Sequence, residues 1–219
     1  MDRSSELRER MVAQQIAARG IRSPALLEAM RVVPRDRFVP RHLRSSAYDD
    51  TPLPIGLGQT ISQPWIVASM IDAASVRPLD RVLEIGAGTG YAASVLGRLA
   101  REVWAMERHQ LLAEEAAARV QDLGYHNVHV IHGDGTLGLP AQAPFDVIIV
   151  SAAGREVPEP LKQQLAVGGR MVMPVGDDPR DQVLMLMRRT DAHTFTRRNL
   201  AKVHFVPLIS GKPDDAPST

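Results

Sequence analysis

The chain has 219 residues, a length that fits one α/β domain with an added segment. Its apolar content of 44% is ordinary for a globular protein. Lys and Arg total 26 and Asp and Glu total 25, so the formal net charge is only +1. This balance argues against duplex nucleic acid as a partner, because such proteins usually carry a basic excess or stripe. The chain has no cysteine, which excludes disulfides, thiolate nucleophiles and cysteine-ligated metal sites.

No apolar run is long enough for a signal peptide or a membrane span, so we expect a cytoplasmic protein without membrane contact. Residues 4–19 have the pattern of an amphipathic helix that ends at Gly20. Ser23-Pro24 is a second helix start signal. The prolines that follow predict turns and extended chain over 32–61, and Gln63-Pro64 starts a third helix that runs to about Ala74.

From residue 81 onward, strand-like and helix-like runs alternate. The predicted strands are Arg81–Ile85, Glu102–Met106, Asn127–Ile131, Phe145–Val150 and Arg170–Val175, and helices are predicted over Tyr91–Ala100 and Leu111–Leu123. This alternation is typical of an α/β fold with a doubly wound, mostly parallel sheet. Gln182–Arg188 and Val203–Leu208 are predicted as an antiparallel pair at one sheet edge.

These elements predict one compact unit with three parts. Residues 1–78 form an N-terminal helical segment with a loop, and residues 79–211 form the Rossmann-like core. The polar, proline-containing tail over 212–219 is expected to be disordered.

The strand Arg81–Ile85 leads directly into a loop that carries Gly86, Gly88 and Gly90. Glycines suit a turn at which the chain bends tightly and the backbone approaches a ligand. The carboxyl end of a strand is where open α/β sheets bind ligands. An ordinary glycine-rich turn is the alternative, but three alternate glycines in this context favour a nucleotide-binding loop.

The spacing of the loop separates two classes of nucleotide. The dinucleotide fingerprint is GxGxxG, whereas here the third glycine comes one residue early and Tyr91 takes the expected position. Glu84 lies two residues before the first glycine. A carboxylate there suits the α-ammonium of S-adenosylmethionine and would repel a pyrophosphate. The loop therefore predicts an S-adenosylmethionine site of the class I methyltransferase type.

Two more strand ends carry residues of the same kind. Glu107, after the second strand, can accept hydrogen bonds from both ribose hydroxyls, although a solvated glutamate is the alternative. After the third strand, Asp134 stands between Gly133 and Gly135 and could accept from the adenine amino group, although a plain turn is the alternative. Three such strand ends together predict one nucleoside-shaped pocket.

The segment before the core closely resembles the signature loop of protein-L-isoaspartate O-methyltransferases. The resemblance is carried by Asp49–Pro64, above all by Thr60–Pro64, and extends over roughly residues 7–211. Further family-like motifs are Val33-Pro34-Arg35, Arg37–Pro40, Val82–Gly86, His132–Gly135, Pro144–Asp146, Gly168–Arg170 and Phe205–Leu208.

The resemblance implies methyl transfer from S-adenosylmethionine to the α-carboxylate of L-isoaspartyl residues, and less well of D-aspartyl residues, in damaged proteins and peptides. It implies that Ser62 belongs to the active site and that Gln59, Thr60 and Ile61 line the cofactor together with it. Glu107 would hold the ribose and Asp134-Gly135 the adenine, and Phe205, Val206, Pro207 and Leu208 would close the substrate side.

Some interpretations stay open at this point. Ser62 could instead cap the helix that begins at Pro64. Leu57 stands where many relatives carry a polar residue and Trp65 where many carry Tyr, and either change could alter substrate preference.

Other activities compete with repair of damaged proteins. A peptide aspartyl O-methyltransferase of a natural-product pathway is the nearest, followed by an RNA or small-molecule methyltransferase, an NAD-dependent oxidoreductase and a non-catalytic scaffold. We expect no metal, because the side chains of His126, His129 and His132 would not converge, and we expect a monomer with an open cleft.

Overall fold

The computed structural model describes residues 3–211. A seven-stranded sheet has the order β5-β4-β3-β6-β7-β8-β9. Its strands are β3 (Arg81–Ile85), β4 (Glu102–Glu107), β5 (Val128–His132), β6 (Phe145–Val150), β7 (Leu165–Val175), β8 (Gln182–Arg189) and β9 (Phe195–Val203). The five strands from β3 to β7 pair in parallel, and β8 and β9 are antiparallel. The predicted α/β class and the mostly parallel sheet are confirmed.

Two hydrophobic clusters cover the two faces of the sheet. Along β3, Val82 belongs to the cluster shared with α3 (Pro64–Ala74) and α4 (Tyr91–Gly97), whereas Leu83 and Ile85 face the other cluster. This alternation follows from the two-residue period of a strand. The first cluster also contains α5 (Gln110–Asp122), and the second contains α6 (Glu159–Gln164).

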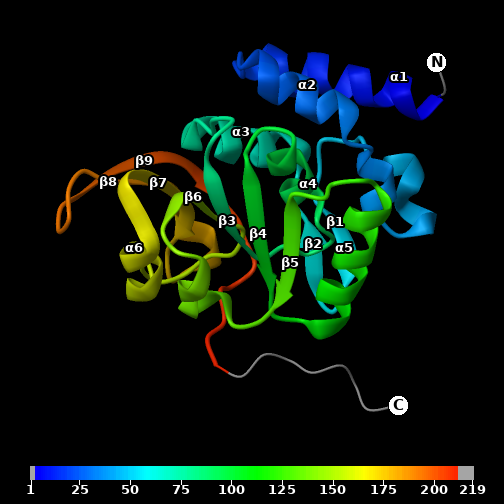
Figure 1. The fold of residues 1–219 in the computed structure, drawn as a ribbon. Helices are drawn as coiled ribbons and strands as arrows, with labels where there is room; N and C mark the ends of the chain where they lie inside the picture. The colour runs from blue at the N-terminus through cyan, green and yellow to red at the C-terminus, as the bar shows by residue number, and fades with distance from the viewer. Residues whose placement is uncertain (1–2, 212–219) are drawn as a thin grey trace.

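The N-terminal segment lies against the first of these clusters. Helix α1 (Arg3–Arg10) continues through a π-helical turn (Met11–Ile16) and a 3₁₀ turn (Ala17–Arg19) to Gly20, whose φ of +100° ends the helical run as predicted. Helix α2 (Pro24–Val32) begins at the predicted Ser23 cap, where the Ser23 hydroxyl accepts from the Leu26 N–H. In Figure 1 these helices lie at the top, and the central strands point away from them.

The prediction for 32–61 was incomplete, and helix α6 after β6 was not predicted. The stretch 32–61 contains 3₁₀ turns (Arg35–Phe38 and Arg41–Ser46) and a hairpin of β1 (Leu53–Gly56) and β2 (Gln59–Ile61). Pro54 obscured the hairpin, although proline is tolerated on an edge strand. The six-residue α6 is too short to show a helical period.

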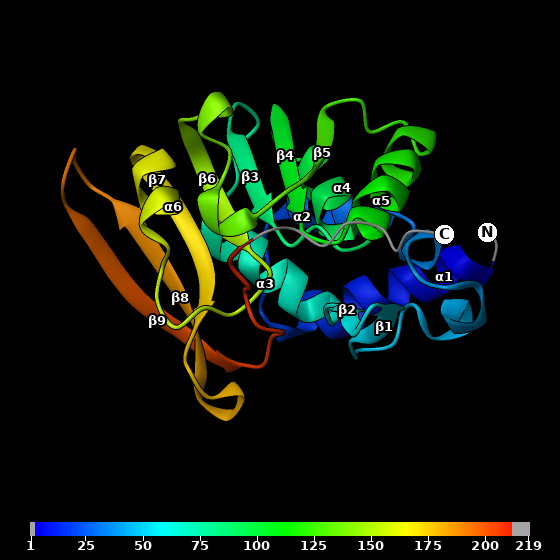
Figure 2. The same ribbon diagram turned by 90° about the horizontal axis from the view of Figure 1, so that it is seen from below.

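The prediction of a strand at Val203–Leu208 was wrong. The edge strand is β9, which ends at Val203, and the segment 204–208 forms no strand but an isolated bridge between Ala153 and Pro207. The segment 195–203 escaped prediction because it is mostly exposed and polar. The apolar run that follows it packs over the cavity described below. Figure 2 shows the β8–β9 hairpin extending away from the N-terminal helices.

No helix within residues 3–211 is long and apolar enough to cross a membrane. The predicted disordered tail over 212–219 lies outside the described residues.

Candidate active site

The order of the strands reverses between β3 and β6, and the glycine loop lies at this point. Its glycines Gly86, Gly88 and Gly90 have φ of +86°, +53° and +85°, a left-handed region that side chains disfavour. The N–H groups of Gly86 and Ala87 both donate to the Met106 carbonyl, at 2.8 and 3.0 Å, which ties the loop to the end of β4. The loop therefore needs glycine for its own backbone, at the place where open α/β sheets bind ligands.

Glu84 is a buried carboxyl beside this loop, with a side chain that is 1% exposed. Its Oε2 atom has no hydrogen-bond partner among the described residues. Burial raises the pKa of Glu84 to about 8, and the nearby Glu107 carboxylate adds to the rise. A buried carboxyl without a partner is costly unless a cation or donor joins it. The site therefore fits the α-ammonium of the predicted cofactor.

Glu107 ends β4 and is engaged with backbone groups. One carboxylate oxygen accepts from the Gly88 N–H at 2.8 Å, and the other accepts from the His109 N–H at 3.0 Å. Each oxygen keeps further lone pairs for ligand hydroxyls. Glu107 thus fixes the glycine loop while its carboxylate borders the cavity.

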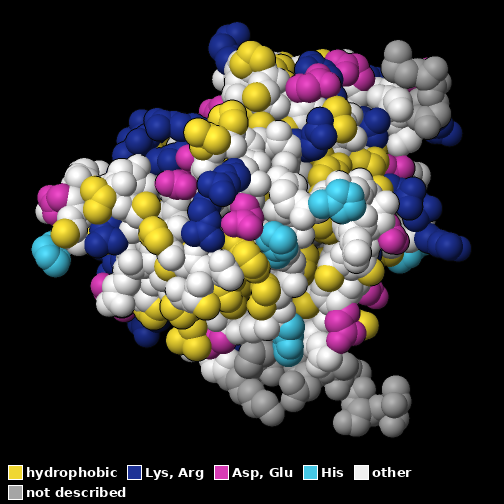
Figure 3. Space-filling view, viewed as in Figure 1, with side chains coloured by type: hydrophobic (Ala, Val, Ile, Leu, Met, Phe, Trp, Pro, Cys, Tyr) yellow, Lys and Arg dark blue, Asp and Glu magenta, His cyan; other side chains and the backbone are white. Residues whose placement is uncertain are grey.

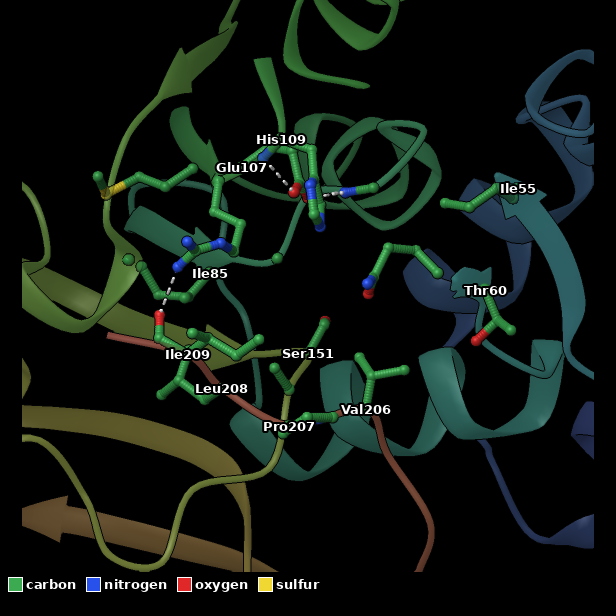
Figure 4. A pocket seen from close by; sticks show the side chains of 17 residues that line it. Ile55, Thr60, Ile85, Glu107, His109, Ser151, Val206, Pro207, Leu208 and Ile209 are labelled. Atoms are coloured by element: carbon green, nitrogen blue, oxygen red, sulfur yellow. Dashed lines mark hydrogen bonds between the residues drawn. The ribbon is translucent and has the colours of Figure 1, made fainter. Parts of the chain in front are cut away.

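A cavity of about 630 Å³ lies between the glycine loop, the ends of β3 and β4, and the C-terminal segment. Figure 4 shows Glu107 and His109 on one side of it, Val206 to Ile209 on another, and Ile55 and Thr60 across from them. The predicted site residues that line it are Gln59, Thr60, Gly86, Gly88, Glu107, Gly135, Val206, Pro207 and Leu208.

A smaller hollow of about 380 Å³ adjoins this cavity and shares residues of its lining. Both are bordered by Thr60, Gly86, Gly88 and Ser151. The predicted site residues Ile61, Ser62 and Glu84 line the smaller hollow. The residues predicted for the acceptor and those predicted for the cofactor are therefore brought together.

Ser62 lies half-buried at this smaller hollow, between β2 and α3. The N-cap of α3 is Gln63, and it makes no side-chain capping bond. The alternative in which Ser62 caps this helix is therefore wrong. The Ser62 hydroxyl makes no hydrogen bond with any residue from 3 to 211, and its carbonyl accepts from Arg35 Nη2 at 2.8 Å.

Asp134 is the predicted site residue whose partners were least expected. One carboxylate oxygen accepts from the N–H and hydroxyl of Thr136, and the other accepts from the Gly211 N–H at 2.8 Å. Partial burial acts to raise the pKa of Asp134, but these hydrogen bonds outweigh it and the pKa is lowered. Gly135 lines the larger cavity, whereas Asp134 does not. A contact between Asp134 and adenine stays a prediction.

Two other predicted residues lie outside both cavity linings. Gly90 packs beneath α5, where a Cβ would come within 3.0 Å of the Val120 side chain. Phe205 is buried, and its N–H and carbonyl are both bonded to the side-chain amide of Gln182. Phe205 therefore anchors the start of the C-terminal segment, and Val206 to Leu208 border the cavity.

Leu57 and Trp65, the two residues that depart from the family pattern, both lie away from the cavities. Leu57 is exposed at the turn of the β1–β2 hairpin, with a φ of +52°. Trp65 packs under the Arg19 guanidinium, whose carbon lies 4.0 Å from the ring centroid. Neither residue lines either cavity.

Several residues at the site were not predicted. Arg108 Nη1 donates to the Ile209 carbonyl at 3.0 Å and holds the C-terminal segment across the cavity (Figure 4). Arg119 donates to the Thr89 carbonyl and supports the glycine loop. Arg35 holds Ser62, as described above. No sequence pattern predicts which arginine donates to which backbone carbonyl, because the two residues are far apart in the chain.

The histidines have partners of other kinds. His129 stacks on Trp104 with the ring centroids 4.3 Å apart, and His132 Nε2 lies 3.0 Å from the Arg108 carbonyl. Within residues 3–211 no group of three or more His, Asp or Glu side chains is arranged to hold a metal ion.

The chain was compared with known proteins. The family model "Protein-L-isoaspartate(D-aspartate) O-methyltransferase (PCMT)" matches residues 6–213. The chain is 56% identical over 202 residues to protein-L-isoaspartate O-methyltransferase 1 of Rhodopseudomonas palustris (strain HaA2), covering 92% of this chain and 82% of the relative. It is 55% identical over 207 residues to the protein-L-isoaspartate O-methyltransferase of Methylorubrum extorquens (strain PA1), covering 94% of this chain and 90% of the relative.

Solved structures agree with this similarity. A protein-L-isoaspartate O-methyltransferase superposes with a TM-score of 0.84 at 30% identity, over 94% of this chain and 67% of the other. A protein described as a beta-aspartate methyltransferase (PCMT) from Plasmodium falciparum, in complex with S-adenosyl-L-homocysteine, shares the fold with a TM-score of 0.80 at 24% identity, over 95% and 99%. With its glycine loop, buried glutamate and adjoining hollow in place, this chain belongs to the protein-L-isoaspartate(D-aspartate) O-methyltransferase family.

Proposed function

We propose that this chain transfers a methyl group from S-adenosylmethionine to the α-carboxylate of L-isoaspartyl residues, and less well of D-aspartyl residues, in damaged polypeptides. The observation that carries the proposal is the smaller hollow, which Ser62 and Thr60 line together with Glu84 and the glycine loop. The identity of the methyl acceptor is inferred from membership of the family.

Residues of the larger cavity and of the adjoining smaller hollow together fit the methyl donor. Glu84, with its unpartnered Oε2 atom, would hold the α-ammonium, and Glu107 would hold the ribose hydroxyls. Gly86, Gly88 and Gly135 would let the backbone approach the ligand closely. S-adenosylmethionine supplies the methyl group on a sulfonium that becomes a neutral thioether.

The acceptor needs no general base, because a carboxylate with a pKa near 4 is already ionised at neutral pH. An anion and a cation neutralise each other during the transfer, so a site shielded from water does not oppose the reaction. The protein's main contribution is then alignment of the attacking oxygen with the methyl carbon and the sulfur. Ser62 is suited to this role, since its hydroxyl can donate to the incoming carboxylate.

The partner that we propose is a polypeptide rather than nucleic acid. Figure 3 shows Lys and Arg side chains interspersed with Asp and Glu side chains over one face of the molecule. We also propose that the protein acts as a monomer, because varied protein substrates require an open cleft.

Two synthetic peptides that differ only in one linkage test the reaction. With labelled S-adenosylmethionine, we expect base-labile label to enter the isoaspartyl peptide and not its aspartyl counterpart. The α-carboxylate of the residue in question is free only in the isoaspartyl peptide, because the β-carboxyl forms the peptide bond there. Label that enters both peptides equally, or neither, would contradict the proposal.

Ser62→Ala tests the orienting hydroxyl. We expect kcat/KM for the isoaspartyl peptide to fall roughly 10-fold or more, as for loss of one hydrogen bond to a charged group. The Kd for S-adenosylhomocysteine should stay unchanged. Ser69→Ala is the matched control, because the Ser69 hydroxyl donates within α3 to the Ile66 carbonyl. Unchanged turnover in Ser62→Ala would remove Ser62 from the catalytic assignment.

A further inference from the structure

Arg35 is the largest side chain that is fully buried in the described part of the chain. Its Nε donates to the Ala47 carbonyl and its Nη2 to the Ser62 carbonyl, both at 2.8 Å. Its guanidinium carbon lies 4.8 Å from the centroid of the Tyr91 ring. One planar group thus contacts three segments that are far apart in the sequence.

Two of these segments border the same smaller hollow. Ser62 comes from the loop before α3, and Tyr91 is the first residue of α4, directly after the glycine loop. Tyr91 is itself buried, with an edge-on contact to Phe38, so its ring is a fixed surface. The position of the Ser62 backbone relative to the cofactor loop is therefore set through the Arg35 guanidinium.

The cost of this arrangement indicates a role beyond packing. Within residues 3–211 Arg35 forms no ion pair with a carboxylate, and its Nη1 atom has no hydrogen-bond partner. Burial accordingly lowers the pKa of Arg35. An apolar side chain of similar volume would fill such a position without the cost of removing a charge from water. Only arginine offers a planar fork with donors aimed at two carbonyls at once.

We propose that Arg35 is a positioning residue for methyl transfer, which holds Ser62 in register with the cofactor loop and thereby orients the acceptor carboxylate. The inference rests on the proposed function. Arg35 acts through Ser62 and the backbone on either side of it. It should therefore affect turnover of the bound acceptor much more than affinity for the cofactor.

The test compares Arg35→Met and Arg35→Lys with wild type in kcat, peptide KM and the Kd for S-adenosylhomocysteine. We expect kcat to fall roughly 30- to 100-fold in Arg35→Met, as for a misplaced reacting group, with the cofactor Kd changed less than about threefold. Arg35→Lys should recover part of the loss, because lysine can still donate to one carbonyl.

A double-mutant cycle with Ser62→Ala separates positioning from general destabilisation. If Arg35 acts through Ser62, then Ser62→Ala should cost little further activity in the Arg35→Met background. The matched control is Arg170→Lys, because Arg170 is also buried and donates to the carbonyls of Ala74 and Ser75 at the far end of α3. That control should lower the Tm and leave kcat unchanged.

Three results would overturn the inference: unchanged kcat in both Arg35 variants, a loss of cofactor affinity in parallel with kcat, or additive effects in the cycle. If Arg35→Met does not fold, the same measurements are made on Arg35→Lys, and any of the three results in that variant would overturn the inference. Failure of the proposed function looks different, since wild type itself would then not methylate the isoaspartyl peptide.

Discussion

Glu84→Gln is expected to weaken binding of S-adenosylhomocysteine by roughly 30-fold or more, as for a buried charge pair that loses one partner. Glutamine keeps the size of Glu84 but cannot pair with the α-ammonium as an anion. Isothermal titration measures the change directly. Glu114→Gln is the control, because Glu114 is an exposed carboxylate on α5. Equal affinity of Glu84→Gln and wild type would show that Glu84 does not hold the ammonium.

The raised pKa of Glu84 gives this binding a pH dependence of definite sign. Without ligand the pKa is about 8, so the carboxyl is mostly protonated at pH 7. A bound cation favours the carboxylate and lowers that pKa, so binding releases a proton below pH 8. The affinity for S-adenosylhomocysteine should therefore rise with pH up to about 8. Above that pH Glu84 is already ionised and contributes no further increase. Titrations at pH 7 in buffers of different ionisation enthalpy should report proton release in wild type and none in Glu84→Gln.

Stability without ligand provides an internal control for the same variant. A carboxyl with a raised folded-state pKa contributes stability that is present at low pH and is lost as the pH rises through 8. Glu84→Gln should therefore be more stable than wild type above pH 8 in thermal unfolding without ligand. A variant that binds poorly and also unfolds more readily at pH 9 would point to misfolding instead.

The cofactor half of the site could be predicted from the sequence because its signals are local. Strand β3, the three glycines and Glu84 lie within ten residues, and the turn itself dictates glycine. Glu107 follows the same rule at the next strand end. The spacing of the glycines and the sign of one charge were sufficient to favour S-adenosylmethionine over a dinucleotide, and membership of the family agrees with that choice.

The parts that could not be predicted depend on contacts between distant segments. One carboxylate oxygen of Asp134 accepts from the Gly211 N–H, 77 residues away, and no sequence pattern near Asp134 predicts this partner. The run Val203–Leu208 resembles a strand, but Val206, Pro207 and Leu208 border a cavity, and the polar strand β9, which ends at Val203, forms the sheet edge. Arg35 contacts Ser62 across 27 residues. In each case tertiary packing, rather than local propensity, decides the structure.

Arg170→Met is expected to lower the free energy of unfolding by about 3–5 kcal/mol, the usual cost of removing one partner from a buried ion pair. Arg170 Nη2 lies 2.6 Å from Asp80 Oδ2, and both side chains are less than a tenth exposed. The same guanidinium donates to the carbonyls of Ala74 and Ser75 and so joins the end of α3 to β7. Within residues 3–211, removing it leaves the buried Asp80 carboxylate with the Arg77 N–H as its one remaining donor from another residue.

Urea unfolding measures this loss as a lower midpoint at an unchanged m-value. Arg155→Met is the matched control, because the Arg155–Asp177 pair is exposed and should contribute no measurable stability. Adding Asp80→Asn to Arg170→Met should restore part of the loss, since the stranded charge is then removed. If the single variant unfolds at the wild-type midpoint, the pair does not support the fold. With kcat retained in the folded Arg170 variant, the two buried arginines would have separate roles: Arg170 stabilises the end of α3, and Arg35 sets the geometry at its beginning.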